Sequence, residues 1–383
     1  MKKEVRHPDK DDAGSLAQKS ASEEAWNEPR HRPFTDQLRR RWKLIAGGSI
    51  VICFTLIAVF ADFLAPYDYR AQSRGEPTAP PTRLHFYHSP SQSYTRPFIH
   101  PRQLVDRLDH RYQEETARSY PLELFTRGYP FKLFGILTVD RHLFGVGGEG
   151  APRAYLLGTD PLGRDHLSRL VIATRFSLYV GLLGTLLTGL LGITLGGVAG
   201  IAGKWADVLL MRAADIMMAL PKLVLILTVR AAFPLELPPA RAAELLIIIF
   251  VALGWAEMAL LTRSLIQELK SRDYVLAAIS IGVSRTRLFR RHLLPNIAPS
   301  LLVTLFLMLP VFLLAEASLS FLGVGLQEPE VSWGKMLAAA SDITLLQQGQ
   351  TTVLLPPALA IALFVLGMRL LSDGVKKERG DDR

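Results

Sequence analysis

Long apolar segments recur along this chain and are separated by stretches rich in charged residues. A helix rises about 1.5 Å per residue, so roughly twenty apolar residues cross the hydrocarbon core of a bilayer. Of the 383 residues, 49% are hydrophobic and 21% are charged, so the two kinds must be concentrated in different segments. The pattern predicts an all-α polytopic membrane protein with six transmembrane helices, at 44–65, 177–202, 208–233, 243–262, 300–319 and 352–371.

The first apolar segment, 44–65, follows a charged stretch that ends in Arg39–Arg41 and Lys43. A cleaved signal peptide would be shorter, would begin nearer the N-terminus and would end at a small-residue cleavage site. We therefore predict an uncleaved membrane anchor with its basic end in the cytoplasm. Residues 1–43 lack apolar periodicity and are predicted to be a disordered tail.

A long polar segment, residues 66–175, separates the first apolar segment from the other five. Within it, Tyr129–Val146 mixes aromatic and β-branched residues as short strands do. Long external segments cross a membrane regardless of their arginine content, so its basic character is compatible with an extracytoplasmic location. The expected organisation is a cytoplasmic tail (1–43), an anchor (44–65), an extracytoplasmic segment (66–175), a five-helix core (176–373) and a cytoplasmic tail (374–383).

Lysine and arginine in the short loops predict which segments are cytoplasmic. The formal net charge is +9, and most of the excess lies beside apolar segments, where basic residues set the topology. Both termini and the loop beginning at Asp273 are expected inside, and the acidic loop Phe321–Gln350 is expected outside. No nucleic-acid-binding motif accompanies the charge, so nucleic acid is not an expected partner. The expected location is the cell (inner) membrane.

The second apolar segment has glycine at every fourth position. Gly192, Gly196 and Gly200 lie on one face of a helix. Small residues at this spacing let two helix backbones approach closely in lipid. The glycines therefore predict helix packing without identifying the partner helix.

Ionisable residues within the apolar segments are candidates for a translocation path, because such residues are rare in membranes and often functional. Arg212 and Asp215 lie three residues apart and can pair on one helix face. Glu257 and Glu316 lie in the fourth and fifth segments. A structural pair at the membrane interface, or a carboxylate that hydrogen-bonds a loop, would explain Arg212, Asp215 and Glu316 equally well, so both interpretations stay open.

The cytoplasmic stretch Asp273–Asn296 combines a small-residue helix with a basic segment. Its distinguishing residues are Ala277, Ala278, Gly282, Arg285, Leu294 and Pro295. Two alanines leave a flat helix surface that fits a groove of another protein, and glycine permits the turn that follows. The arginines are suited to an acidic protein surface, although topology and anionic lipid alone would also explain them.

Catalytic patterns are missing from the sequence, which contains no H-E-x-x-H motif and no nucleophile elbow. Gly203-Lys204 resembles the end of a phosphate loop, but Val198 occupies the position of the required glycine and Trp205 follows the lysine. The single cysteine, Cys53, excludes an intramolecular disulfide. We expect neither an enzyme nor a chain that itself binds a metal or a cofactor.

The stretch Asp273–Asn296 resembles the cytoplasmic signature loop of ABC-importer permeases. That pattern is E-A-A, three residues, Gly, nine residues, an apolar residue, any residue and Leu-Pro. The residues that match are Ala277, Ala278, Gly282, Leu294 and Pro295. Leu276 replaces the usual glutamate, and His292 replaces the apolar residue.

Four further stretches resemble the C-type (second) permease subunit of the oligopeptide, dipeptide and nickel group. They are Leu157–Arg169, Leu210–Pro221, Glu316–Gly325 and Val331–Leu337. The chain departs from the group at Leu260, Arg369 and Ser372, and its external segment is longer than is typical.

The resemblance implies a type I ABC-importer permease fold that forms half of a translocation pore. It implies a second homologous permease, two ATPase subunits that bind ATP and Mg²⁺, an extracytoplasmic solute-binding protein and the lipid bilayer as partners. Peptides are the default cargo, and nickel or another small solute is the alternative. A secondary transporter would be expected to show inverted repeats, and no clear repeat is found.

Overall fold

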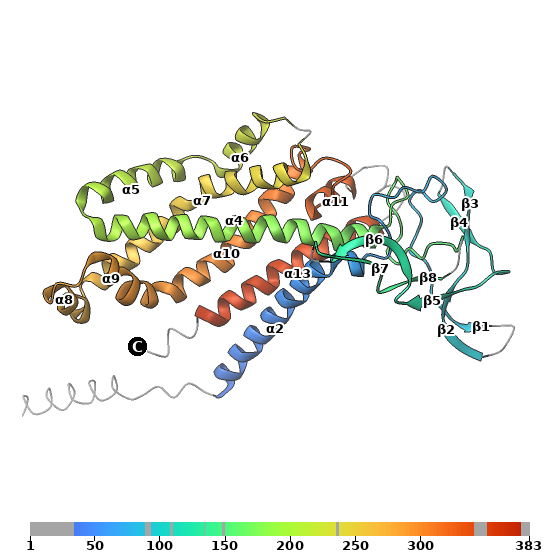
Figure 1. Cartoon of the computed structure of the whole chain (residues 1–383), viewed down its shortest axis with the longest axis horizontal. Coiled ribbons are helices and arrows are strands. Elements are labelled where there is room, and N and C mark those ends of the chain that lie inside the picture. The colour runs from blue at the N-terminus through green and yellow to red at the C-terminus, as the bar shows by residue number, and fades with distance from the viewer. Residues whose placement is uncertain are drawn as a thin grey trace, which may run out of the picture. The chain divides into compact units, whose positions relative to one another are not determined.

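Long helices and a smaller set of strands make up the computed structural model of the chain (Figure 1). It describes residues 34–88, 93–107, 110–133, 135–147, 150–234, 237–340 and 351–376. Residues 1–42 form one unit and residues 43–383 another. Within residues 1–42, the structure describes only the residues from Phe34 onward, which are helical. The predicted disordered tail is therefore wrong for residues 34–43, which are helical, and its remainder lies outside the described residues.

Five of the described helices are long and apolar enough to cross a membrane: α2, α4, α7, α10 and α13. The helices are α2 (Phe34–Val59), α3 (Ala61–Leu64), α4 (His166–Ala202), α5 (Lys204–Ala219), α6 (Lys222–Ala231), α7 (Pro239–Lys270), α8 (Asp273–Ser280), α9 (Arg285–Leu288), α10 (Leu294–Phe321), α11 (Trp333–Ala340) and α13 (Thr351–Lys376). A short π-helix, Phe289–Leu293, joins α9 to α10.

The predicted third span, 208–233, is broken in the structure. Helix α5 ends at Ala219, Leu220 and Pro221 are extended, and α6 begins at Lys222. Proline has no N–H group and disfavours the helical conformation of the residue before it. Among the described residues, the segment counted as the third of six transmembrane helices therefore consists of two shorter helices.

Helix α4 begins eleven residues before the predicted position, at His166 rather than 177. The side chain of Asp165 accepts a hydrogen bond from the Ser168 backbone N–H at 2.8 Å. This contact caps the helix, because it satisfies an N–H group that has no partner within the first turn. The end of the predicted external segment is therefore the start of α4.

The glycine row of α4 packs against α7. A Cβ added to Gly196 would lie 2.3 Å from the Ala259 carbonyl oxygen, and one added to Gly192 would lie 2.5 Å from the Met258 Cβ. Gly200 meets Ile266 in the same way. The predicted helix packing is confirmed, and its partner belongs to this chain.

Helices α2 and α13 also approach each other through glycine. A Cβ on Gly47 would lie 2.7 Å from the Gly367 carbonyl oxygen. Near the same crossing, Lys43 Nζ and Asp373 Oδ2 form an ion pair at 3.0 Å. The beginning of the first span and the end of the last span therefore lie side by side.

Between α3 and α4, the chain forms strands, which corrects the all-α prediction. They are β1 (His85–His88), β2 (Ser93–Ile99), β3 (Arg102–Asp106), β4 (Arg111–Glu114), β5 (Tyr120–Leu124), β6 (Arg127–Leu133), β7 (Leu137–Arg141) and β8 (Phe144–Val146). A four-stranded sheet has the order β1-β2-β5-β8, and β3-β4 and β6-β7 form two separate hairpins. The strands predicted within Tyr129–Val146 are confirmed. Residues 66–165 are called the strand domain below.

The helices have two distinct ends (Figure 1). Helices α8 and α9 lie at one end, here called the loop end, and the strand domain lies at the other, the strand end. Buried apolar clusters run between them, and the cluster nearest the loop end joins α7, α8 and α10 through Ile266, Val275 and Ile297. The two ends carry the polar features described next.

Candidate functional site

The loop end contains a short helix that stops at a rigid turn. Gly282 follows α8 with φ +78°. The Val283 N–H donates to the Ala278 carbonyl at 3.1 Å, and the Gly282 N–H donates to the Ile279 carbonyl at 3.0 Å. These two bonds define a Schellman motif, which favours glycine because its left-handed conformation crowds a Cβ. The glycine turn predicted from sequence is therefore present.

Helix α8 has an exposed apolar face and a buried one. Leu276 and Ile279 are exposed, as is Ile281 just after the helix, and Ala277 lies on the same surface. Ala278, by contrast, is buried in the chain's own core. The prediction that both alanines face a partner is therefore wrong for Ala278, because a helix turns by about 100° per residue.

The basic segment after Gly282 is only partly free to contact other molecules. The Arg285 guanidinium donates to the Ala202 carbonyl at 2.6 Å. This bond satisfies the C-terminal end of α4, where a positive charge also suits the helix dipole. Arg285, predicted as a docking residue, thus has a structural contact, although its side chain is exposed, as are those of Arg287, Arg290 and Arg291.

Leu294 and Pro295 begin helix α10. Proline occupies the first turn, where its missing N–H group has no helix partner to lose. The π-helix before it packs on α4, since a Cβ on Gly197 would lie 2.8 Å from the Phe289 ring. The signature stretch is thereby fixed to α4 at one point and continues directly into a membrane span.

Arg212 and Asp215 do not pair with each other. Both are exposed on α5, and the ion pair of this helix is instead between Asp207 and Arg263 of α7, with two contacts at 2.5 and 2.6 Å. A bidentate arginine–carboxylate contact fixes orientation as well as distance. The predicted pairing of Arg212 and Asp215 is therefore wrong. Spacing along α5 alone could not show that Arg263 of α7 pairs with Asp207 instead.

A cavity of about 450 Å³ lies between α6, α7 and α10. Apolar side chains such as Phe250 and Phe312 form most of its lining, together with the charged residues Lys222 and Glu257. Lys222 Nζ and Glu257 Oε2 form a hydrogen-bonded ion pair at 2.7 Å, with both side chains about half exposed. The break at Pro221 positions Lys222 in the first turn of α6. An ion pair facing a cavity between membrane helices is a candidate for a pathway contact.

Glu316 is buried at the strand end of α10, with 1% of its surface exposed. Its carboxylate accepts a hydrogen bond from Ser320 Oγ at 2.8 Å. The hydroxyl groups of Ser177 and Ser332 interact with the same carboxyl group, and Ser177 also accepts from the Trp333 backbone N–H at 3.2 Å. Of the two interpretations left open by the sequence, these contacts favour the structural one.

We expect Glu316→Gln to retain near-normal uptake, because the amide oxygen can still accept from Ser320. Glu316→Ala should lower the free energy of unfolding by about 1–3 kcal/mol, since it leaves buried hydroxyl groups without their acceptor. Thermal unfolding of the purified protein in detergent, with uptake and basal ATPase of the assembled transporter, distinguishes the two roles. Loss of uptake in a Glu316→Gln variant of unchanged stability would contradict the structural role.

Charged residues at the start of α4 form a buried network at the strand end. Arg164 Nε contacts Asp160 Oδ2 at 2.6 Å, and its NH1 group contacts Glu328. Arg169 lies 3.6 Å from each of the same two carboxylates. Arg164 thus pairs with Asp160, whereas Asp165 serves as the helix cap.

The loop before α11 is held by this network. Burial alone would raise the pKa of Glu328, but the hydrogen bond from Arg164 and the charge of Arg169 outweigh it, so its pKa lies below the usual value. The resulting stabilisation is present above the ordinary pKa of a glutamate and is lost as the pH falls through the lower folded-state pKa. Glu330 holds the same loop to Tyr69 and Arg70 of the strand domain.

Within the strand domain, the residues that lead into α4 are joined to residues 78 and 79 by backbone hydrogen bonds. The Thr78 N–H donates to the Asp160 carbonyl at 2.9 Å, and the Thr159 N–H donates to the Ala79 carbonyl at 2.9 Å. Gly158 has φ +78°, and a Cβ there would lie 2.4 Å from the Ala79 carbonyl oxygen. The stretch Leu157–Arg169 is thus the attachment point between the strands and the helices.

Sequence reasoning missed two of these contacts. Asp207–Arg263 and Lys222–Glu257 each join residues far apart in the sequence. The signal that could have revealed the second pair is a basic and an acidic residue in different apolar segments. Complementary charges alone do not identify partners, however, because the contact depends on which helices are neighbours.

The structure is that of a multi-helix membrane protein. A short helical loop at one end, a polar domain at the other and a cavity between the helices that contains an ion pair are typical of transport proteins. Comparison with known proteins specifies the class. Residues 192–377 match the family described as binding-protein-dependent transport system inner membrane component. Residues 33–81 match the N-terminal transmembrane domain of oligopeptide transport permease C.

Curated relatives agree with these matches. The chain is 34% identical to the oligopeptide transport system permease protein of Bacillus subtilis over 219 residues, which is 57% of this chain and 69% of that protein. It is 42% identical over 228 residues to the dipeptide transport system permease protein of Escherichia coli K12, covering 60% and 73% of the two chains. The di/tripeptide permease of Pseudomonas aeruginosa is 39% identical over 228 residues, covering 60% and 72%. The chain belongs to the family of binding-protein-dependent transport permeases and is a membrane permease subunit of an ABC transporter.

Proposed function

We propose that this permease carries peptides and forms half of the translocation pore of an importer. The other half would be a second homologous permease. Two ATPase subunits, which bind ATP and Mg²⁺, would dock at the loop end, and a solute-binding protein would deliver cargo at the strand end. The peptide cargo is proposed because the similar proteins are named as oligopeptide, dipeptide and di/tripeptide permeases.

The exposed apolar face of α8 is the observation that carries the coupling role. Leu276, Ile279 and Ile281 are open to solvent at a polar end of the protein. Apolar groups grouped in this way favour burial against another protein. Leu276, which replaces the usual glutamate of the family pattern, makes this surface more apolar, so we propose a mainly apolar fit into an ATPase groove.

Transmission requires that the docked helix be connected rigidly to the membrane spans. The Schellman turn at Gly282, the bond from Arg285 to α4 and the continuous passage into α10 supply such connections. A displacement of α8 would therefore move α4 and α10. Interfaces of this kind are suited to rigid-body motion, because packed elements shift as units.

Co-purification and vesicle transport test this proposal directly. We expect the nucleotide-binding subunits to co-purify with the chain, and vesicles containing the complete assembly to take up dipeptide only when ATP is present inside. Uptake driven by an ion gradient without ATP would overturn the ABC mechanism in favour of a secondary transporter.

We further propose that α5 and α6 together form the sixth membrane crossing. The protein would then lie in the inner membrane with both termini in the cytoplasm. The chain leaves α4 at the loop end and enters α7 from the strand end, so residues 204–238 must connect the two ends. Helices of 16 and 10 residues span about 39 Å at 1.5 Å per residue, which is sufficient for a bilayer core.

The cavity with Lys222 and Glu257 is proposed as part of the pathway. Its position halfway along α7 and α10 is where substrate sites of transporters tend to lie, and a helix that begins within the membrane adds a positive dipole end. A peptide with charged termini presents an ammonium and a carboxylate, which complement Glu257 and Lys222. The predicted pathway residue Glu316 is not part of this proposal.

We expect Lys222→Met to reduce dipeptide uptake about tenfold, which corresponds to about 1.4 kcal/mol. The change leaves Glu257 unpaired beside the cavity, so uptake is compared with that of Lys222→Arg, which keeps the charge. The double variant Lys222→Met/Glu257→Met removes the pair without leaving a lone charge. Full recovery of uptake in the double variant would mean that neither charge is needed for transport and would contradict the pathway role.

A further inference from the structure

The β6–β7 hairpin has an exposed apolar turn. Ile136 is 89% exposed and Leu137 is 61% exposed. Turns are usually polar because they run over the protein surface and their backbone faces water. Two large aliphatic side chains at this position indicate a surface that is covered by another molecule.

The base of the hairpin is fixed to the end of a membrane-spanning helix. The Leu143 N–H donates to the Phe63 carbonyl at 2.9 Å, and His142 Nδ1 hydrogen-bonds with the Asp62 carbonyl at 2.9 Å. The Phe125 ring lies 6.1 Å from that of Phe63. Asp62 and Phe63 belong to α3, which follows α2 after one residue, so the hairpin begins where the first span ends.

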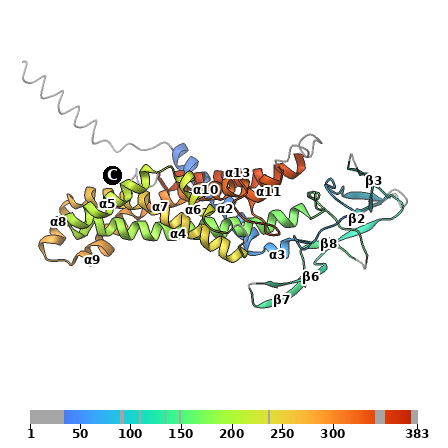
Figure 2. The same ribbon diagram turned by 90° about the horizontal axis from the view of Figure 1, so that it is seen from above.

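The hairpin points away from the other strands. Figure 2 shows β6 and β7 projecting from the strand domain on the side of α3, whereas β2 and β3 extend away from the helices. The apolar turn therefore lies beside the helical bundle, at the level where its spans end.

Apolar surface continues from the span to the strand domain without interruption. A groove of about 640 Å³ lies along α2 and reaches Leu143. Its lining residues are Ser49, Ile52, Cys53, Leu56, Ile57, Phe60, Phe63, Leu64 and Leu143. Exposed apolar side chains of a membrane-spanning helix face acyl chains. Because Leu143 lines the same groove, the lipid-facing surface extends into the strand domain.

Basic residues accompany the apolar turn. Arg127, Lys132 and Arg141 are exposed on the hairpin, and Asp140 is its one acidic residue between 127 and 141. Arg127 contacts Asp140 only at 4.0 Å, with both side chains well exposed. Cationic residues next to an apolar surface are typical of segments that lie at the phospholipid interface.

We propose that the β6–β7 hairpin rests on the bilayer surface at the strand end and binds phospholipid. Ile136 and Leu137 lie below the headgroups, the three basic side chains contact lipid phosphates, and one acyl chain occupies the groove along α2. The hairpin thereby holds the strand domain in a fixed position above the ends of the spans.

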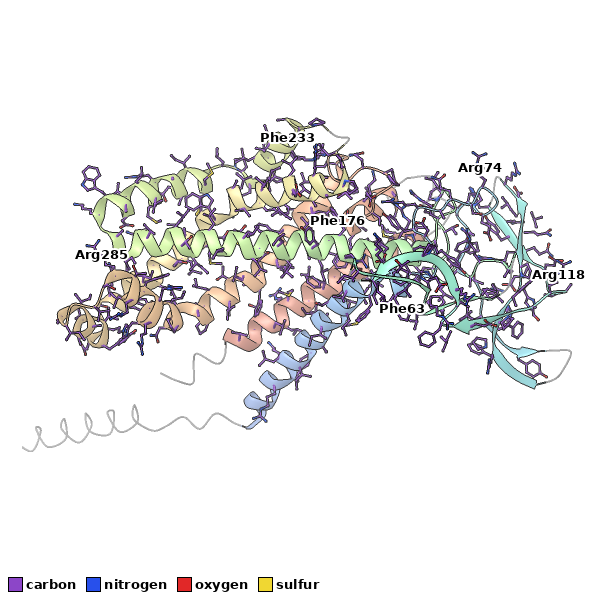
Figure 3. The ribbon with its side chains drawn as sticks, viewed as in Figure 1. Phe63, Arg74, Arg118, Phe176, Phe233 and Arg285 are labelled. Carbon is purple, nitrogen blue, oxygen red and sulfur yellow. The ribbon has the colours of Figure 1, made fainter. Side chains whose placement is uncertain are left out.

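A fluorescent probe at the hairpin turn tests this arrangement. In a Cys53→Ser background, Ile136→Cys is labelled with an environment-sensitive dye, and Arg118→Cys serves as the matched control. Figure 3 shows Arg118 at the far edge of the strand domain. The full chain is reconstituted with its partner subunits in vesicles of phosphatidylethanolamine and phosphatidylglycerol that contain spin-labelled phospholipid.

We expect the spin-labelled lipid to quench the dye at position 136 several-fold more than the dye at 118, and aqueous iodide to quench them in the opposite order. Equal iodide quenching at both positions would overturn the proposal. Protection at 136 that appears only after a purified solute-binding protein is added, without quenching by lipid, would also overturn it in favour of a protein partner.

A dye at a second position shows whether lipid quenching at position 136 is a property of that label alone. Leu124, 70% exposed, lies near the base of the hairpin, and Leu124→Cys should also be quenched by the lipid-borne probe. Lipid quenching at both 124 and 136, but not at 118, is the expected pattern. Absence of lipid quenching at both 124 and 136 would overturn the proposal even if the labelled protein transports normally.

Discussion

Gly282→Trp is expected to abolish uptake while leaving the protein in the membrane. Gly282 has φ +78°, and no atom lies within 4 Å of a Cβ added there. A side chain at this position would therefore start in open space, and an indole would project from the turn beside the apolar face of α8. Docking of an ATPase subunit against that face would be blocked. ATP-dependent uptake and the amount of protein in the membrane fraction measure the two effects.

The control for this variant is Gly282→Ala. It carries a similar backbone penalty of about 1–2 kcal/mol for a left-handed non-glycine residue, but adds only a methyl group. We expect Gly282→Ala to retain most of the uptake and to co-purify with the ATPase subunits. Normal transport by Gly282→Trp would contradict the coupling role, and equal loss in both variants would attribute the effect to backbone strain.

Asp160→Ala is expected to lower the free energy of unfolding by about 3–5 kcal/mol, the usual cost of removing one partner from a buried ion pair. Asp160 is 5% exposed and contacts both Arg164 and Arg169. Its other carboxylate oxygen accepts the Leu162 and Arg164 backbone N–H groups at 3.0 and 2.9 Å. The variant therefore leaves two buried guanidinium groups with Glu328 alone, which thermal unfolding in detergent would detect.

Asp140→Ala is the matched control. Asp140 is exposed and lies 4.0 Å from Arg127, so its removal should change stability by no more than about 0.5 kcal/mol. Asp160→Asn, which keeps one acceptor oxygen for the backbone, should fall between the two alanine variants. An Asp160→Ala protein as stable as Asp140→Ala would mean that the network at the strand end does not hold α4 in place.

Sequence patterns were reliable where the physical constraint is local. The apolar segments predicted the membrane-spanning helices, because a helix in lipid must satisfy its own backbone groups. Proline at position 221 lies at the break between α5 and α6, because it has no N–H group to continue a helix. Gly282 predicted a turn, and the Schellman motif is present.

Predictions failed where the answer depended on a neighbouring helix. Ala278 matched the docking pattern but faces the core. Arg212 and Asp215 had suitable spacing, yet the ion pair of α5 is between Asp207 and Arg263. In each case the sequence fixes a residue's position on its own helix and leaves the packing partner undetermined.

The sequence by itself determined the class of protein, the family it resembles and the location of the loop that we propose for coupling. These depend on hydrophobic length, on the positions of glycine and proline and on motif spacing, all of which act within one segment. Only the tertiary structure decided that Gly196 packs on Ala259, that Lys222 pairs with Glu257 beside a cavity and that Ile136 lies uncovered at the turn of the β6–β7 hairpin. Contacts between segments depend on how the helices are arranged, and many arrangements are compatible with the same apolar pattern.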